Sequence, residues 1–212
     1  MSLLAVALAA VVLGATPVLA QPSREQALHE LREPSVEVRR RAVQTLAEVG
    51  TMADVAALTR ALRDADGHVR AFAEAAMWQI WSRSGDDEVD RLLALGIEQM
   101  NARAGTAAVE TFSRIIQRKP DFAEGWNKRA TVYYLLGQYE KSLADCHEVM
   151  KRNPFHFGAL SGSGMNYLRL RRPEEALAAF EQALAINPNL ESLRQHLQLL
   201  RDLLIQQRKD TS

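Results

Sequence analysis

Only one cysteine, Cys146, occurs in the 212 residues, so no disulfide can form within the chain. Its position in a helical pattern predicts a buried thiol that packs as a small apolar side chain, with a reactive or intermolecular thiol as the alternative. Basic and acidic residues balance at 26 each, and no basic block occurs. Because phosphate backbones are bound by clustered Lys and Arg, nucleic acid is not expected as the main partner.

The sequence also lacks the motifs of common chemistries. Its five histidines stand singly, without the paired spacing of zinc ligands. No glycine-rich phosphate loop, nucleophile elbow or H-E-x2-H motif occurs. We interpret the acidic run Asp86, Asp87 and Glu88 as the start of a helix, whose dipole acids complement, rather than a cation site. We therefore expect no catalytic residue, metal or cofactor, and a protein that is not an enzyme.

Charged side chains are absent from residues 1–20, where a 13-residue apolar run precedes a small-residue site ending at Ala20. This layout is typical of a secretory signal peptide cleaved before Gln21, although the usual early Lys or Arg is missing. The run is shorter than the about 20 residues of a membrane-spanning helix. We expect a periplasmic or secreted bacterial protein with no membrane insertion after cleavage. An uncleaved N-terminal membrane anchor is the alternative.

The chain does have a period of 34 residues, marked by Pro120, Pro154 and Pro188. Superposing the three segments aligns large residues with large ones and small residues with small ones, which indicates stacked helix pairs. The aligned sets are Leu92, Trp126 and Leu160; Gly96, Ala130 and Gly164; Gln99, Tyr133 and Tyr167; Ala108, Ser142 and Ala176; Phe112, Cys146 and Phe180; and Ile115, Val149 and Ala183.

The middle segment reads W-x3-A-x2-Y-x3-G-x-Y-x2-S-x3-C-x2-V-x4-P and closely resembles the tetratricopeptide repeat. The resemblance implies an all-α, right-handed solenoid of stacked helix pairs, with units at 89–122, 123–156 and 157–190. Leucines recur every three or four residues in 191–209, which predicts an amphipathic capping helix. A homodimer formed through this leucine-lined helix is the alternative.

A shorter pattern, V-R-x2-A, begins at Val38 and again at Val69. It resembles the short HEAT-like repeats of bacterial proteins, so residues 23–84 are expected to form HEAT-like helical repeats that lean on the first tetratricopeptide unit. The arginines of the two motifs should tie neighbouring turns together through carbonyls or carboxylates. Trp78 and Trp81 should seal the junction, with an exposed aromatic contact for a partner as the alternative.

The resemblance also implies a working surface, the concave groove formed by the first helix of each unit. The lysine, asparagine and arginine clamp that grips a terminal carboxylate in the best-known grooves is absent here, except for Lys128. The mixed lining that remains suits a peptide segment or amphipathic helix of another protein. The residues expected at the groove are Leu93, Ile97, Met100, Asn127, Lys128, Thr131, Tyr134, Ser161, Met165, Leu168 and Arg169.

Gly158 and Gly162 fall four residues apart on this groove face, inside a helix where each glycine costs about 1 kcal/mol relative to alanine. The hypothesis is that they let a ligand backbone or a neighbouring helix approach closely, and the alternative is an interior contact within the solenoid. Together these features predict an exported scaffold or adaptor that binds a partner segment. An accessory or regulatory subunit of a cell-envelope enzyme complex is the alternative.

Overall fold

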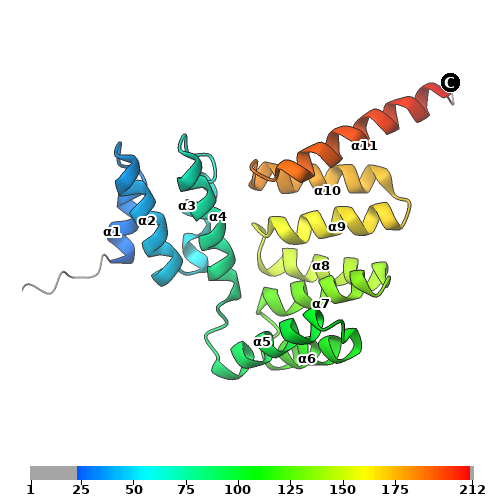
Figure 1. Cartoon of the computed structure of the whole chain (residues 1–212), viewed down its shortest axis with the longest axis horizontal. Coiled ribbons are helices and arrows are strands. Elements are labelled where there is room, and N and C mark those ends of the chain that lie inside the picture. The colour runs from blue at the N-terminus through cyan, green and yellow to red at the C-terminus, as the bar shows by residue number, and fades with distance from the viewer. Residues whose placement is uncertain (1–22, 211–212) are drawn as a thin grey trace, which may run out of the picture.

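The computed structural model describes residues 23–210, so the predicted signal peptide lies outside the described residues. Within this range the chain forms eleven α-helices and one short 3-10 helix and has no strand, which confirms the all-α prediction (Figure 1). The helices are α1 (Arg24–Glu30), α2 (Val36–Val49), α3 (Val55–Ala61), α4 (Gly67–Ser82), α5 (Asp87–Asn101), α6 (Gly105–Arg118), α7 (Ala123–Leu135), α8 (Tyr139–Arg152), α9 (Phe157–Arg169), α10 (Pro173–Ile186) and α11 (Glu191–Asp210), and the 3-10 helix is Met52–Asp54.

Three helix pairs, α5–α6, α7–α8 and α9–α10, stack into a solenoid that α11 closes (Figure 1). A small residue on the first helix of a pair admits a large one from the second, as the aligned repeat predicted. A Cβ atom added at Gly96 would lie 2.4 Å from the Phe112 ring, and one added at Gly164 would lie 2.2 Å from the Phe180 ring. The two helices of each of these pairs therefore touch where glycine leaves room.

Helix ends follow the local sequence signals. The Asp86 carboxylate accepts hydrogen bonds from the backbone N–H groups of Glu88 and Val89, so the acidic run caps α5 as expected. The turns within the three pairs share one backbone feature, a left-handed residue at Arg103, Gly137 and Arg171 with φ of 60°, 72° and 58°. These positions are 34 residues apart, and only the middle one is a glycine.

The N-terminal arm, α1 to α4, is held together by arginines in the way that the V-R-x2-A pattern predicts. Arg39 forms a two-pronged ion pair with Asp64 at 2.7 and 2.9 Å and also donates to the Glu33 and Pro34 carbonyls. Arg70 donates to the carbonyl of Asp64 at 2.8 Å. Each arginine therefore ties its helix to a preceding turn, although the assignment of these helices to HEAT-like repeats stays a prediction.

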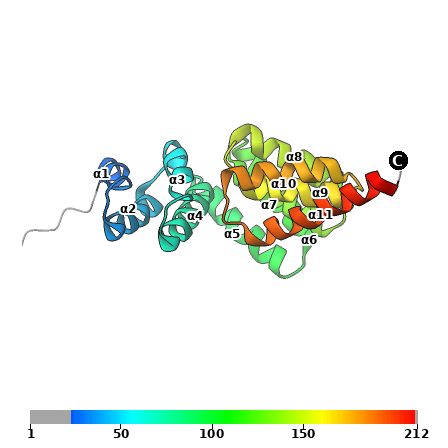
Figure 2. The same ribbon diagram turned by 90° about the horizontal axis from the view of Figure 1, so that it is seen from above.

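The arm does not lean on the first helix pair, so that expectation is wrong. The rings of Trp78 and Trp81 on α4 pack against Phe157, the first residue of α9. Asn189, in the turn before α11, donates to the Leu62 carbonyl at 2.8 Å. The apolar core of the arm thus continues into α9, α10 and α11, whereas α5 and α6 enclose a separate core. Figure 2 shows the arm beside the stack.

The last helix, α11, behaves as the expected cap. Leu193, Leu197, Leu200 and Leu204 are buried in the main core. Among residues 23–210, no helix is both long enough and apolar enough to cross a membrane.

Candidate functional site

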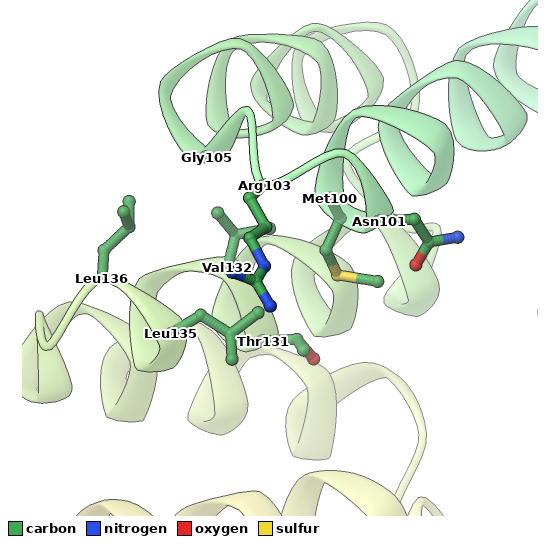
Figure 3. A pocket seen from close by; sticks show the side chains of 8 residues that line it. All are labelled: Met100, Asn101, Arg103, Gly105, Thr131, Val132, Leu135 and Leu136. Carbon is green, nitrogen blue, oxygen red and sulfur yellow. The ribbon is translucent and has the colours of Figure 1, made fainter.

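The side of the solenoid formed by α5, α7 and α9 carries two hollows, and Figure 3 shows the larger of these two. This first hollow has a volume of about 550 Å³ and lies between the C-terminal ends of α5 and α7. Leu135 and Leu136 border it with apolar side chains that are 66% and 44% exposed. Its lining residues are Met100, Asn101, Arg103, Gly105, Thr131, Val132, Leu135 and Leu136.

The second hollow, of about 150 Å³, lies between α7 and α9, with α8 as its floor. Thr131 borders both hollows, so the two lie next to each other on the side of α5, α7 and α9, and we call them together the track. The second hollow is lined by Asn127, Ala130, Thr131, Tyr134, Ser142, Cys146, Gly158, Gly162, Met165 and Asn166.

Several predicted groove residues line these hollows. Met100 borders the first hollow, Asn127, Tyr134 and Met165 border the second, and Thr131 borders both. Their helical phase was sufficient to place them, because the first helix of each pair turns one continuous face toward the groove.

Four predicted groove residues line neither hollow. Ile97 packs against the core of the first pair, and Lys128 is drawn to the buried carboxylate of Glu124, at 3.0 Å. The Ser161 hydroxyl donates to the Phe157 carbonyl one turn back, at 2.8 Å. The Arg169 guanidinium lies over the Tyr139 ring, 5.0 Å from its centroid.

Two further leucines that were expected at the groove belong to the interior. Leu93 is buried in the core of the first pair, and Leu168 packs against the main core. Leu93 is therefore an interior side chain, and Leu168 is half-buried against the core, so neither lines the hollows.

The two glycines of the groove hypothesis have different surroundings. A Cβ atom at Gly158 would lie 2.5 Å from Cη2 of Trp78, so this glycine serves an interior contact with the arm, as the alternative proposed. A Cβ atom at Gly162 would meet only the Cys146 sulfur, at 3.6 Å. Of the two glycines, therefore, Gly162 is the one that leaves room at the groove surface.

The floor of the second hollow contains polar groups that sequence reasoning missed. Asn166 Nδ2 donates to Ser142 Oγ at 2.8 Å, and Ser142 Oγ donates to the Ala130 carbonyl at 2.7 Å. Asn166 Oδ1 is buried and has no hydrogen-bond donor among the described residues. A signal was available, because Ser142 stands where the two other units carry Ala108 and Ala176.

Cys146 lies at the base of this hollow and is 2% exposed. Burial raises the pKa of its thiol to about 11, so the thiolate is scarce at neutral pH. The expectation of a buried structural thiol is confirmed. Within residues 23–210 no group of three or more His, Cys, Asp or Glu side chains is placed to hold a metal ion.

A buried carboxylate lies beneath the groove-facing side of α7. Glu124 is fully buried and accepts from His156 Nε2 at 3.2 Å and from the Lys128 ammonium at 3.0 Å. Burial alone raises the pKa of Glu124, but the hydrogen bond from His156 and the charge of Lys128 outweigh it and lower that pKa below its ordinary value. Lys128 is therefore engaged with a carboxylate of its own chain.

The helix pairs, their small-to-large packing and the shared concave track define an α-solenoid with a groove on its inner face. Residues 121–189 match the tetratricopeptide repeat family. The chain therefore contains tetratricopeptide repeats, as the motif from Trp126 to Pro154 predicted.

Two curated relatives have the same kind of repeat. A TPR repeat-containing protein of Rhizobium etli is 32% identical over 124 residues, which cover 58% of this chain and 61% of that protein. The small glutamine-rich tetratricopeptide repeat-containing protein 2 of Mycosarcoma maydis is 26% identical over 110 residues, covering 52% and 31%. The chain thus matches less than two thirds of the length of either relative.

Solved structures share the fold at low sequence identity. The Sgt2 TPR domain from Aspergillus fumigatus has a TM-score of 0.56 at 19% identity, covering 60% of this chain and 85% of that domain. The first TPR of Spaghetti (RPAP3), bound to an HSP90 peptide, has a TM-score of 0.55 at 20% identity, covering 56% and 94%. The Yersinia enterocolitica chaperone SycD, in complex with a YopD peptide, has a TM-score of 0.51 at 12% identity, covering 60% and 97%.

Proposed function

We propose that the protein is a non-enzymatic adaptor that binds a segment of another protein along the track formed by the two hollows. The observation that carries this proposal is that the two hollows are neighbours that share Thr131, together with exposed Leu135 and Leu136 at one end. An extended segment or an amphipathic helix can lie along such a track and place apolar side chains in both hollows. The peptides held by the Spaghetti and SycD domains support the same use of the fold.

The partner segment is recognised by its side chains rather than by a terminal carboxylate. The only basic clamp position that the chain retains, Lys128, is paired with Glu124. The second hollow, at about 150 Å³, takes a single aliphatic side chain. The Asn127 amide group donates to Glu124 and the Thr131 hydroxyl donates to the Asn127 carbonyl, so Asn127 Oδ1 and Thr131 Oγ1 at its border are left to accept hydrogen bonds from the ligand backbone.

A displayed library of random 12-residue peptides, selected on the purified protein, tests this function. The affinity of a selected peptide is then measured by fluorescence anisotropy for the wild type, for Gly162→Leu, which fills the second hollow, and for Glu181→Gln on α10, outside both hollows. We expect Gly162→Leu to weaken binding at least about tenfold and Glu181→Gln to leave it unchanged. Failure to select any peptide, or equal affinity for Gly162→Leu, contradicts the proposal.

We further infer that the adaptor works in the periplasm or outside the cell, because residues 1–20 have the layout of a signal peptide. Mass spectrometry of the protein from fractionated cells checks this, and a mature chain beginning at Gln21 in the envelope fraction is the expected result. A full-length chain in the membrane fraction identifies the uncleaved anchor instead. A homodimer through α11 stays a prediction, with exposed Leu199, Leu203 and Ile205 as its apolar face.

A further inference from the structure

A separate cavity of about 310 Å³ lies where the arm meets the stack, away from the groove. We call it the junction cavity. It is a surface cavity bordered by Met52, the end of α4, the linker to α5, the turn between α6 and α7, the start of α7 and the end of α8. The residues that matter for its chemistry are Trp81, Arg83, Lys119, Ala123, Arg152 and Asn153.

Two buried hydrogen-bond donors border the junction cavity without an acceptor. Trp81 and Asn153 are 3% and 1% exposed. Neither the indole Nε1 of Trp81 nor the amide Nδ2 of Asn153 has a hydrogen-bond partner in the part of the chain that the structure describes. A buried donor without an acceptor is destabilising, so both groups favour a ligand that brings acceptor atoms.

The repeat itself shows which kind of acceptor suits this amide. Asn153 and Asn187 are 34 residues apart, and each Oδ1 accepts the backbone N–H two residues on, from Phe155 at 3.1 Å and from Asn189 at 3.0 Å. Asn187 uses its Nδ2 to donate to the carboxylate of Glu74 on α4, at 3.0 Å. At the equivalent turn, Asn153 Nδ2 faces no such carboxylate. The junction cavity therefore lacks the acidic partner that its repeat equivalent has.

Two features of the surroundings also favour a negative group, because the buried carboxylate of Glu124 in the first turn of α7 is already compensated by His156 and Lys128. Helix α7 is 13 residues long and begins at Ala123, and the side chain before it, Phe122, cannot cap its N–H groups. Lys119 borders the cavity and forms no ion pair with any described residue. One carboxylate, Asp121, lies on the wall, but it is exposed to solvent.

The two arginines of the wall have partners already and add only long-range charge. Arg83 donates to the carbonyls of Glu48 and Gly50 at 2.8 and 3.1 Å. Arg152 is paired with Glu148 at 2.6 Å. Lys119 is therefore the cation of this wall that is free to bind a ligand.

We propose that the junction cavity is a binding site for a small oxyanion, a carboxylate or a phosphate group. Trp81 Nε1 and Asn153 Nδ2 are the neutral donors, the start of α7 supplies oriented N–H groups, and Lys119 supplies the opposite charge. The volume is at the lower end of the range of small-molecule sites. The ligand would lie between α4 and the stack and would link the two. This site does not depend on the adaptor function.

The test follows the three tryptophan indole N–H signals of the 15N-labelled full chain by NMR. Sodium acetate and sodium phosphate are titrated separately, and sodium chloride at matched ionic strength is the control. We expect the Trp81 signal to shift saturably with acetate, with phosphate or with both. The anion that produces the shift identifies the ligand class. Lys119→Gln should weaken this binding about tenfold. Lys141→Gln makes the same charge change outside the cavity and should leave the affinity unchanged.

Two results overturn the proposal. The first is a Trp81 signal that responds to neither anion, or that responds equally to chloride. The second is an equal loss of affinity in Lys119→Gln and Lys141→Gln, which would show that only overall charge matters. Lys119 is a half-exposed side chain without an ion pair, so its replacement leaves the fold intact and the comparison interpretable.

Discussion

The imidazole of His156 donates from Nε2 to the carboxylate of Glu124 across 3.2 Å, and both side chains are fully buried. The other ring nitrogen, Nδ1, accepts the backbone N–H of Ala159 at 3.0 Å, so the neutral ring carries its proton on Nε2. The Trp81 ring of the arm stacks on the imidazole at 4.4 Å. This pair therefore joins α7, the turn before α9 and the arm.

Replacing Glu124 with glutamine should lower the free energy of unfolding by about 2 kcal/mol at pH 7, since His156 and Lys128 lose a charged acceptor in the interior. The midpoint of urea denaturation measures the change. The control is Glu181→Gln, which breaks the half-exposed ion pair with Arg201 and should cost less than about 1 kcal/mol. Equal losses in the two variants would contradict an energetic role for burial.

The contribution of the Glu124–His156 pair to the free energy of unfolding should depend on pH in one direction. The pKa of Glu124 in the folded protein lies below the ordinary carboxyl value of 4.5. Its contribution to stability is therefore fully present above pH 4.5 and is lost as the pH falls through the lowered pKa. The gap in urea midpoint between the wild type and Glu124→Gln should be full at pH 7 and should shrink below pH 4.5. A gap that widens on acidification would contradict this assignment.

Alanine at two glycines of α9 should have opposite effects. Gly162→Ala adds a Cβ atom that makes an ordinary contact with the Cys146 sulfur at 3.6 Å, so it should stabilise the chain by up to about 1 kcal/mol through helix propensity. Gly164→Ala would place its Cβ atom 2.2 Å from the Phe180 ring and should destabilise by about 1 to 3 kcal/mol. Thermal midpoints measured by circular dichroism compare the two variants. Destabilisation by Gly162→Ala would contradict this prediction, because it would show that other side chains of the protein already fill the second hollow at Gly162.

The same contacts explain how much of the fold could be predicted from sequence. The 34-residue period predicted the helix pairs because Gly164 and Phe180 lie in a local contact between adjacent helices. The docking of the arm could not be predicted in this way. It depends on Trp78 meeting Gly158 and on Trp81 packing against Phe157, both far along the chain, and no periodicity encodes those contacts.

Some of the residues expected at the groove line the two hollows and others do not, and side-chain length explains the difference. Helical phase predicted that Thr131 and Met165 face the groove, and both line the second hollow, because phase decides which way a Cα–Cβ bond points. Phase does not tell what the end of a long side chain will bind. Lys128 is drawn to Glu124, and Arg169 lies over Tyr139, because each finds a partner within the protein.

The left-handed turn residue of the third pair offers another test. Arg171 has a φ of 58°, whereas glycine occupies the equivalent position at Gly137. A side chain in this conformation costs about 1 kcal/mol, and glycine relieves it. We expect Arg171→Gly to raise the free energy of unfolding by about 0.5 to 1 kcal/mol and Gly137→Ala to lower it by a similar amount. Urea denaturation measures both, and a loss of stability in Arg171→Gly would show that the arginine side chain contributes contacts that outweigh the strain.

The thiol of Cys146 should react far more slowly in the folded chain than in the unfolded one. Its pKa is raised to about 11 by burial, so near pH 7 the thiolate fraction is at least about a hundredfold below that of an ordinary cysteine. Because the chain has one cysteine, the absorbance of the coloured thiolate that an aromatic disulfide reagent releases reports the reaction of this residue alone. The expected result is slow release of this thiolate in buffer and rapid release in roughly 8 M urea, where the chain is unfolded. Rapid release in buffer would mean that the floor of the second hollow opens readily, and it would make Cys146 accessible to the same partners that enter the groove.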